Sequence, residues 1–139
     1  MMVTGGISWN MSPRVTCIAL IALIGCAPAD PLAGFSPFAT MGCGGYYLAL
    51  AANPATSTTD RQYYEALADG LVAATTEFSP ASRAEVTTEM ERWRDDWQNE
   101  LQSDWAQTAE GRAENANFVR ECADLTGRLS TTRGIQRAG

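Results

Sequence analysis

The chain has 139 residues and a formal net charge of −6. Its basic residues are all arginine, because lysine and histidine are absent. An acidic chain without a basic face is not expected to be a general nucleic-acid binder. Without histidine or lysine it also lacks the commonest general base, the imidazole metal ligand and the Schiff-base amine. We therefore expect no enzyme, no cofactor and no metal site.

Residues 14–25 have the composition of a secretory signal peptide. Arg14 supplies a positive charge, residues 15–24 form a short apolar run, and the small residue Gly25 follows. The run is too short to span a bilayer as a helix, which takes about 20 apolar residues. It is also apolar on all sides, unlike a surface helix of a globular domain. The residues before Met11 carry no charge, so Met11 is a candidate for the true start.

The end of this segment, Leu23-Ile24-Gly25-Cys26, resembles the lipobox of bacterial lipoproteins. The resemblance implies a signal peptide over residues 1–26, with diacylglycerol attached to the Cys26 thiol before cleavage. Ala27 in the next position implies delivery to the outer membrane, so we expect a protein of the periplasm anchored there by acyl chains. The alternative is cleavage after Ala27-Pro28-Ala29, which would release a soluble periplasmic or secreted protein.

Both cleavage sites leave the same two cysteines, Cys43 and Cys122. Cys17 leaves with the signal peptide, and Cys26 is either lipidated or removed. In an oxidising periplasm an isolated pair in a small domain is most simply a disulfide. The pair has neither the C-x-x-C spacing nor the histidine partner of a reactive thiol. We predict a structural disulfide that stabilises the fold by about 4 kcal/mol, since it closes a loop of about eighty residues.

Residues 27–37 contain three prolines and a glycine and are predicted to be a flexible tether. The domain is predicted over residues 38–129. Its first helix is expected over residues 42–52, ending before Pro54 because the residue preceding a proline disfavours the helical conformation. A second helix is expected over residues 61–77, with N-cap residues just before it and apolar residues at three- and four-residue steps.

A third helix is expected to begin at Ser79-Pro80, with Ser82 and Glu85 as an alternative capping box. Its apolar positions recur at steps of three and four and drift around the helix toward its end. They are Val86, Met90, Trp93, Trp97, Leu101 and Trp105.

Gly111 is expected to break the chain before a fourth helix over residues 113–129, followed by a disordered tail over residues 130–139. Phe118, Cys122, Leu125 and Leu129 share one face of this helix. No segment alternates with a two-residue period. The sequence therefore predicts an all-α fold, a small up-and-down helical bundle of about four helices linked by one disulfide.

Carboxylates line the predicted third helix at spacings of mostly four or seven residues. Ca²⁺ needs six to eight converging oxygens, which a straight helix edge does not supply. Arg92 is spaced for intrahelical pairing with Glu89 and Asp96. We interpret the row as a solvated acidic face that could meet a basic partner. A catalytic carboxylate pair is the one route to an enzyme that sequence leaves open. The row consists of Glu85, Glu89, Asp96, Glu100 and Asp104.

The tryptophans of the same helix are expected to lie mostly in the core, because their spacing is helical. Trp105 is the best candidate for an exposed anchor, since the drift carries it furthest from the core direction. We take Trp97 and Trp105, edged by Glu100 and Asp104, as the candidate partner-binding residues. A small-ligand pocket lined by aromatic residues is the alternative.

These observations predict an exported small helical envelope protein that acts by protein–protein binding, of the inhibitor, immunity or accessory-subunit kind. Its partner would be another protein of the envelope, and its lipid anchor would hold it to the membrane. A soluble periplasmic protein that binds a small ligand, and a structural envelope lipoprotein without a specific ligand, are the alternatives.

Overall fold

The computed structural model describes residues 30–138, so the predicted signal peptide and the lipidation site at Cys26 lie outside the described residues. Within that range the chain forms helices and no strand, which confirms the all-helical prediction. The elements are α1 (Pro37–Ala52), α2 (Thr58–Phe78), α3 (Arg83–Leu101), a short 3-10 helix η1 (Trp105–Gln107) and α4 (Ala109–Arg133).

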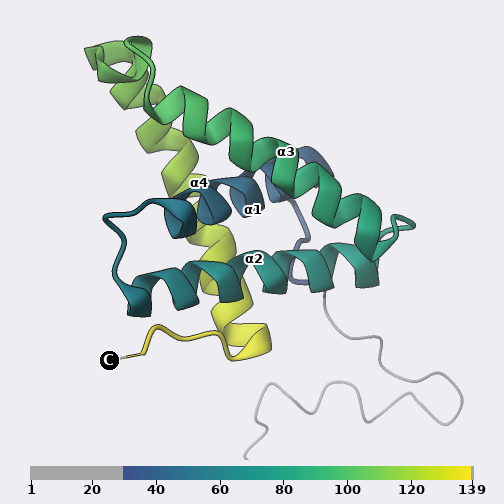
Figure 1. The fold of residues 1–139 in the computed structure, drawn as a ribbon. Coiled ribbons are helices and arrows are strands. Elements are labelled where there is room, and N and C mark those ends of the chain that lie inside the picture. Colours follow the sequence, from purple (N-terminus) through teal and green to yellow (C-terminus); the bar gives the residue numbers. More distant parts are fainter. Residues whose placement is uncertain (1–29, 139) are drawn as a thin grey trace, which may run out of the picture.

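Helix α1 is the central element of the bundle. It packs mainly against α2 and α3, which lie on either side of it (Figure 1). Helix α4 crosses steeply behind α1 and α2, and its N-terminal part extends toward the end of α3 (Figure 1). Helix α1 therefore joins α2 to α3, and the end of α3 meets the N-terminal part of α4 at one corner of the bundle (Figure 1).

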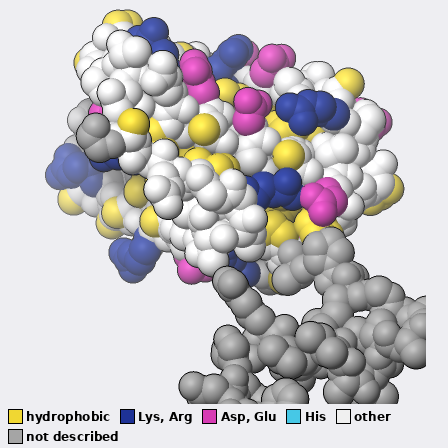
Figure 2. All heavy atoms as spheres, turned by 90° about the horizontal axis from the view of Figure 1, so that it is seen from below, with side chains coloured by type: hydrophobic (Ala, Val, Ile, Leu, Met, Phe, Trp, Pro, Cys, Tyr) yellow, Lys and Arg dark blue, Asp and Glu magenta, His cyan; other side chains and the backbone are white. Residues whose placement is uncertain are grey.

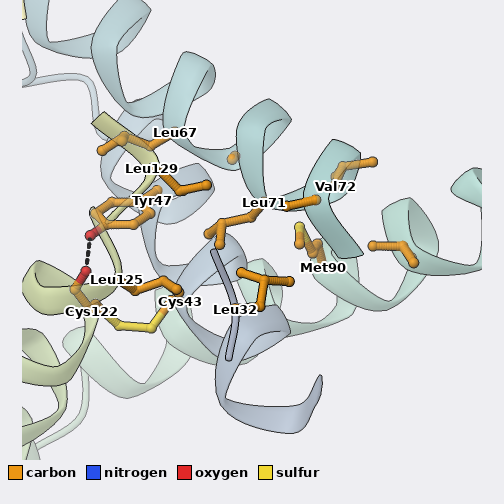
Figure 3. Packing of buried hydrophobic residues seen from close by; sticks show 13 residues of the cluster. Leu32, Cys43, Tyr47, Leu67, Leu71, Val72, Met90, Cys122, Leu125 and Leu129 are labelled. Carbon is orange, nitrogen blue, oxygen red and sulfur yellow. Dashed lines mark hydrogen bonds between the residues drawn. A yellow bond between two sulfur atoms is a disulfide. The ribbon is translucent and has the colours of Figure 1, made fainter. Parts of the chain in front are cut away.

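The core lies where α1, α2 and α4 face one another (Figure 3). Each leucine buried there stabilises the fold by about 2 kcal/mol, because apolar surface is removed from water. Helix α3 contributes Val86 and Met90 to the core, as predicted. Helix α4 contributes Cys122, Leu125 and Leu129 from its predicted apolar face. The largest fully buried side chains are Leu67, Leu71, Val86, Met90, Leu125 and Leu129.

The predicted disulfide is present between Cys43 and Cys122. The two Cα atoms are 5.5 Å apart, within the usual range for such a bond. Both cysteines are buried, and the bond joins α1 to α4 across the core (Figure 3). This covalent link fixes the steeply crossing helix to the central one.

Helix α1 begins five residues earlier than the expected start at residue 42. Ser36 caps it by accepting a hydrogen bond from the backbone N–H of Ala39 at 3.1 Å. Gly44 and Gly45 lie inside this helix and face Met90 and Trp93 of α3. A Cβ on Gly45 would stand 2.3 Å from Trp93 Cβ, so glycine is required there for the two helices to approach.

The end of the predicted tether is packed onto the domain rather than flexible. Pro31 and Leu32 are buried, and Leu32 belongs to the hydrophobic core. The guanidinium of Arg128 lies 4.8 Å from the Phe35 ring centroid and donates to the Ala33 carbonyl oxygen. The expected tether over residues 27–37 is therefore shortened, because its apolar side chains find a place in the core.

Two starts were predicted for the third helix, and the structure has the second of them: α3 begins at Arg83, after the N-cap residue Ser82. Ser82 and Glu85 form the capping box, in which each side chain accepts from the other's backbone N–H. The hydrogen bond that the Glu85 carboxylate accepts from the Ser82 backbone N–H lowers the pKa of Glu85. Ser79 instead ends α2, so the expected start at Ser79-Pro80 is wrong.

Helix α4 is longer at both ends than predicted. Thr108 caps it by accepting from the backbone N–H of Gly111 at 3.0 Å, so the expected break at Gly111 is wrong. A Cβ on Gly111 would lie 2.2 Å from the Trp105 carbonyl oxygen, which explains the glycine by close approach. The helix ends at Arg133, before Gly134 in the left-handed conformation, rather than at residue 129.

A buried tyrosine hydroxyl joins α1 to α4 beside the disulfide. The Tyr47 hydroxyl donates to the Cys122 carbonyl oxygen at 2.9 Å (Figure 3). It also lies against the Thr126 hydroxyl. Burial raises the pKa of Tyr47 from 10.0 to about 12, partly offset by the hydrogen bond with Thr126. Ionisation of this side chain is therefore disfavoured in the folded state.

This pKa predicts a loss of stability in alkali. Because the folded pKa lies above the unfolded one, the stabilisation is complete below about pH 10 and is lost as the pH rises toward about 12. Urea unfolding should show a free energy lower by about 1 kcal/mol at about pH 11 than at about pH 9. Tyr47→Phe should remove this part of the pH dependence and lower stability at neutral pH by about 1 kcal/mol. If the free energy of unfolding of the variant fell equally in alkali, the loss of stability would be due to the other tyrosines.

Candidate functional site

A hollow of about 480 Å³ opens at the corner between the start of α1, the end of α3, η1 and α4. We call it the aromatic groove. Its walls are aromatic rings and its polar lining is acidic, with no arginine among the lining residues. It is lined by Phe38, Ala39, Gly42, Trp93, Trp97, Glu100, Trp105, Glu114, Asn115, Phe118 and Glu121.

The aromatic rings of the groove pack on one another in two pairs. Trp97 and Phe118 have ring centroids 4.5 Å apart, and Phe38 meets Trp93 edge to face at 4.6 Å. Trp97 is 9% exposed, and Tyr46 backs it at 5.3 Å on the side of the core. The inner ring of the groove is thus held rigidly by its neighbours.

Two of the aromatic residues face solvent. Phe38 is 64% exposed and Trp105 is 41% exposed. These two rings differ from scattered surface apolar residues, because both line the same hollow as the buried rings.

Trp105 is exposed for a different reason from the one expected. Helix α3 ends at Leu101, and the chain turns before η1 begins at Trp105. Ser103 stabilises the turn: its hydroxyl donates to the Glu100 carbonyl oxygen at 2.7 Å and accepts from the Ala106 N–H at 3.2 Å. The expected apolar seam through Leu101 and Trp105 is therefore wrong, and Leu101 is itself exposed.

The structure brings together three of the four predicted binding residues. Trp97, Glu100 and Trp105 line the aromatic groove, whereas Asp104 is exposed outside it, just before η1. The other lining residues were not predicted from the sequence, among them two aromatic and two acidic ones. Phe38 stood at the edge of the predicted tether and Phe118 on a predicted core face, and Glu114 and Glu121 had no visible connection to α3.

The acidic residues of α3 fall into two groups in the structure. Arg92 pairs with Glu89 and, at 3.6 Å, with Asp96, as their spacing predicted, and this pairing lowers the pKa of Glu89. Glu100 has no ion pair within residues 30–138, and the same holds for Glu114 and Glu121 of α4. The groove therefore carries three uncompensated carboxylates.

Other parts of the surface differ from the groove in their charge. On the face shown in Figure 2, arginine and acidic side chains are interspersed, and neither sign dominates. Ion pairs join elements elsewhere: Arg133 with Glu77 at 2.6 Å, and Arg137 with Asp60. Acidic side chains on these parts of the surface thus lie near arginines, whereas the lining of the groove contains carboxylates and no arginine.

Three polar atoms of groove-lining residues are buried without a hydrogen-bond partner in the described part of the chain. They are Oε1 of Glu100 and the indole Nε1 atoms of Trp93 and Trp97. A buried polar atom that makes no hydrogen bond is destabilising by about 1–3 kcal/mol. Most buried polar atoms in proteins have a partner, either in the protein or in ordered water, so these atoms are unusual.

The chain matches no known family model, no curated protein and no solved structure. No helix between residues 30 and 138 is long and apolar enough to cross a membrane. Over the same residues, no three acidic or cysteine side chains are grouped so that they could hold a metal ion.

Proposed function

We propose that this chain is an exported small helical protein of a bacterial envelope that acts by binding another protein through the aromatic groove. The observation that supports this most directly is the pairing of exposed rings, Phe38 and Trp105, with a rigid inner wall around Trp97. Tryptophan and tyrosine dominate the binding energy of protein interfaces, where anchors fill pockets ringed by polar residues. An inhibitor, immunity or accessory-subunit role would use such a surface.

The signal-like segment supports the proposed location. Its resemblance to a lipobox places the lipid on Cys26, some ten residues before the start of α1 at Pro37. A protein held in this way would present the groove close to the membrane surface. The outer membrane is the expected site of the anchor.

A second candidate function is the binding of a small ligand by a soluble periplasmic form. The volume of the groove, about 480 Å³, falls within the range of small-molecule sites, about 300–1,000 Å³. Tryptophan fluorescence during titration with envelope metabolite extracts would respond in this case and stay unchanged if only proteins bind.

Photo-cross-linking tests the protein-binding proposal. Benzoylphenylalanine in place of Trp105 should give a light-dependent adduct of one defined mass in the native cells, because this side chain is exposed at the groove. The matched control carries the same group in place of Gln62, an exposed residue of α2 away from the groove. No adduct from position 105, or the same adducts from both positions, would contradict the proposal.

The anchor is tested separately by Cys26→Ser. We expect this variant to leave the membrane fraction, while the far-ultraviolet circular dichroism of the purified domain stays helical. The intact mass of the wild-type protein should show a lipidated terminus at Cys26. A mass equal to that of a chain beginning at Asp30 would instead establish the soluble form.

A further inference from the structure

The aromatic groove combines features that select for a particular ligand chemistry. Three carboxylates, Glu100, Glu114 and Glu121, line it without an ion pair within residues 30–138, and no arginine lines it. A second, smaller hollow of about 210 Å³ shares Trp93, Trp97 and Glu100 with the groove, and its other lining residue, Asp96, pairs with Arg92. Carboxylates focused in a concave site attract cations.

The aromatic walls narrow the class of cation. The face of an indole attracts ammonium and guanidinium groups through its quadrupole. The chain shows this contact within itself, because the Arg92 guanidinium lies 5.6 Å from the Trp93 ring centroid. A guanidinium is planar and less strongly hydrated than an ammonium, so it both stacks on rings and binds carboxylates in a bidentate manner. An arginine side chain therefore fits better than a lysine side chain.

The unpartnered buried atoms favour an arginine that belongs to a polypeptide. Oε1 of Glu100 is an acceptor without a donor, and the Nε1 atoms of Trp93 and Trp97 are donors without an acceptor. Trp97 is more than nine-tenths buried, so a partner group must enter the groove to reach its N–H. An arginine residue in a chain offers guanidinium donors and a backbone carbonyl acceptor together. A quaternary ammonium ion offers neither.

We propose that the aromatic groove receives an arginine side chain of the partner protein, with Glu100 as its counter-ion and the rings around Trp97 as its stacking surface. This inference rests on the proposed function, since it names the chemistry by which the partner is recognised. The net charge of −6 of the chain favours the same encounter over longer distances.

The test uses capped single residues as probes of the purified protein. Acetyl-arginine methylamide is titrated while the indole N–H signals of Trp93, Trp97 and Trp105 are followed by nuclear magnetic resonance. Single substitutions to phenylalanine assign these signals. Acetyl-citrulline methylamide has the same shape without the charge, and acetyl-lysine methylamide has the charge without the planar fork. We expect the arginine probe to bind about tenfold more tightly than citrulline.

Matched variants locate the effect. Glu100→Gln should abolish the preference for arginine over citrulline, whereas Asp104→Asn, a nearby carboxylate outside the groove, should leave it unchanged. Equal binding of arginine and citrulline, or an undiminished preference in Glu100→Gln, would overturn the inference. Tighter binding of tetramethylammonium than of the arginine probe would also overturn it, because it would assign the groove to free cations.

The two proposals fail in distinguishable ways. Cross-links from position 105 without any preference for arginine would leave protein binding standing and remove only the arginine. A preference for arginine without cross-links would contradict the proposal that the groove binds a protein. It would therefore also contradict the proposal that the arginine belongs to a partner protein.

Discussion

Replacing Cys43 and Cys122 together by alanine is expected to lower the free energy of unfolding by about 4 kcal/mol. The bond closes a loop with a sequence separation of 79 residues, so its loss gives the unfolded chain much more freedom. It also lies where α4 reaches the core: Cys122 is buried, while Glu121 before it is exposed. We expect α4 to depend on this bond more than α2 or α3 do.

Urea unfolding followed by circular dichroism measures this effect, with the oxidised wild type as reference. Wild-type protein in dithiothreitol should lose about as much stability as the double variant, and the double variant should not respond to dithiothreitol. A loss below about 1 kcal/mol in both experiments would show that packing alone holds α4 in place.

Gly45→Ala is expected to destabilise the fold by about 3 kcal/mol, at the upper end of the effect of overpacking. The added Cβ would stand 2.3 Å from Trp93 Cβ and 2.7 Å from the backbone nitrogen of Arg94. Backbone atoms cannot move aside as a side chain can, so α1 and α3 would have to separate. Because Trp93 also lines the aromatic groove, this separation should weaken binding there as well.

Two other glycines serve as controls in thermal or urea unfolding. Gly127 lies within α4 with open space around it, so Gly127→Ala should stabilise the fold by about 1 kcal/mol through helix propensity. At Gly44 the new Cβ would meet the flexible end of Met90 at 2.4 Å, so Gly44→Ala should fall between the two. Equal stabilities of Gly45→Ala and Gly127→Ala would contradict the close approach of α1 and α3.

Much of the helical arrangement could be predicted from local patterns. The capping box of Ser82 and Glu85, the buried face of α4 and the disulfide all follow from short-range chemistry or from the count of cysteines. The errors concern element ends. Gly111, which was expected to break the chain, is explained instead by the close approach of the Trp105 backbone from η1, which local propensity does not contain.

The candidate site was predictable only on one helix. Trp97 and Glu100 are three residues apart on α3, so the sequence pattern connected them. Phe38 and Phe118 come from distant parts of the chain. Asp104 was included because the helix was extrapolated past Leu101, whereas the chain turns there. A sequence pattern has no information on which helices meet at one corner.

By itself the sequence determined that this domain is all-helical, acidic and closed by one disulfide. Helical periodicity, capping residues and a single available cysteine pair are local or combinatorial properties, so they are legible without coordinates. Only the tertiary structure decided that α4 crosses the bundle steeply and leaves an aromatic groove with uncompensated carboxylates. The groove exists because rings from α1, α3, η1 and α4 converge, and convergence depends on packing between helices.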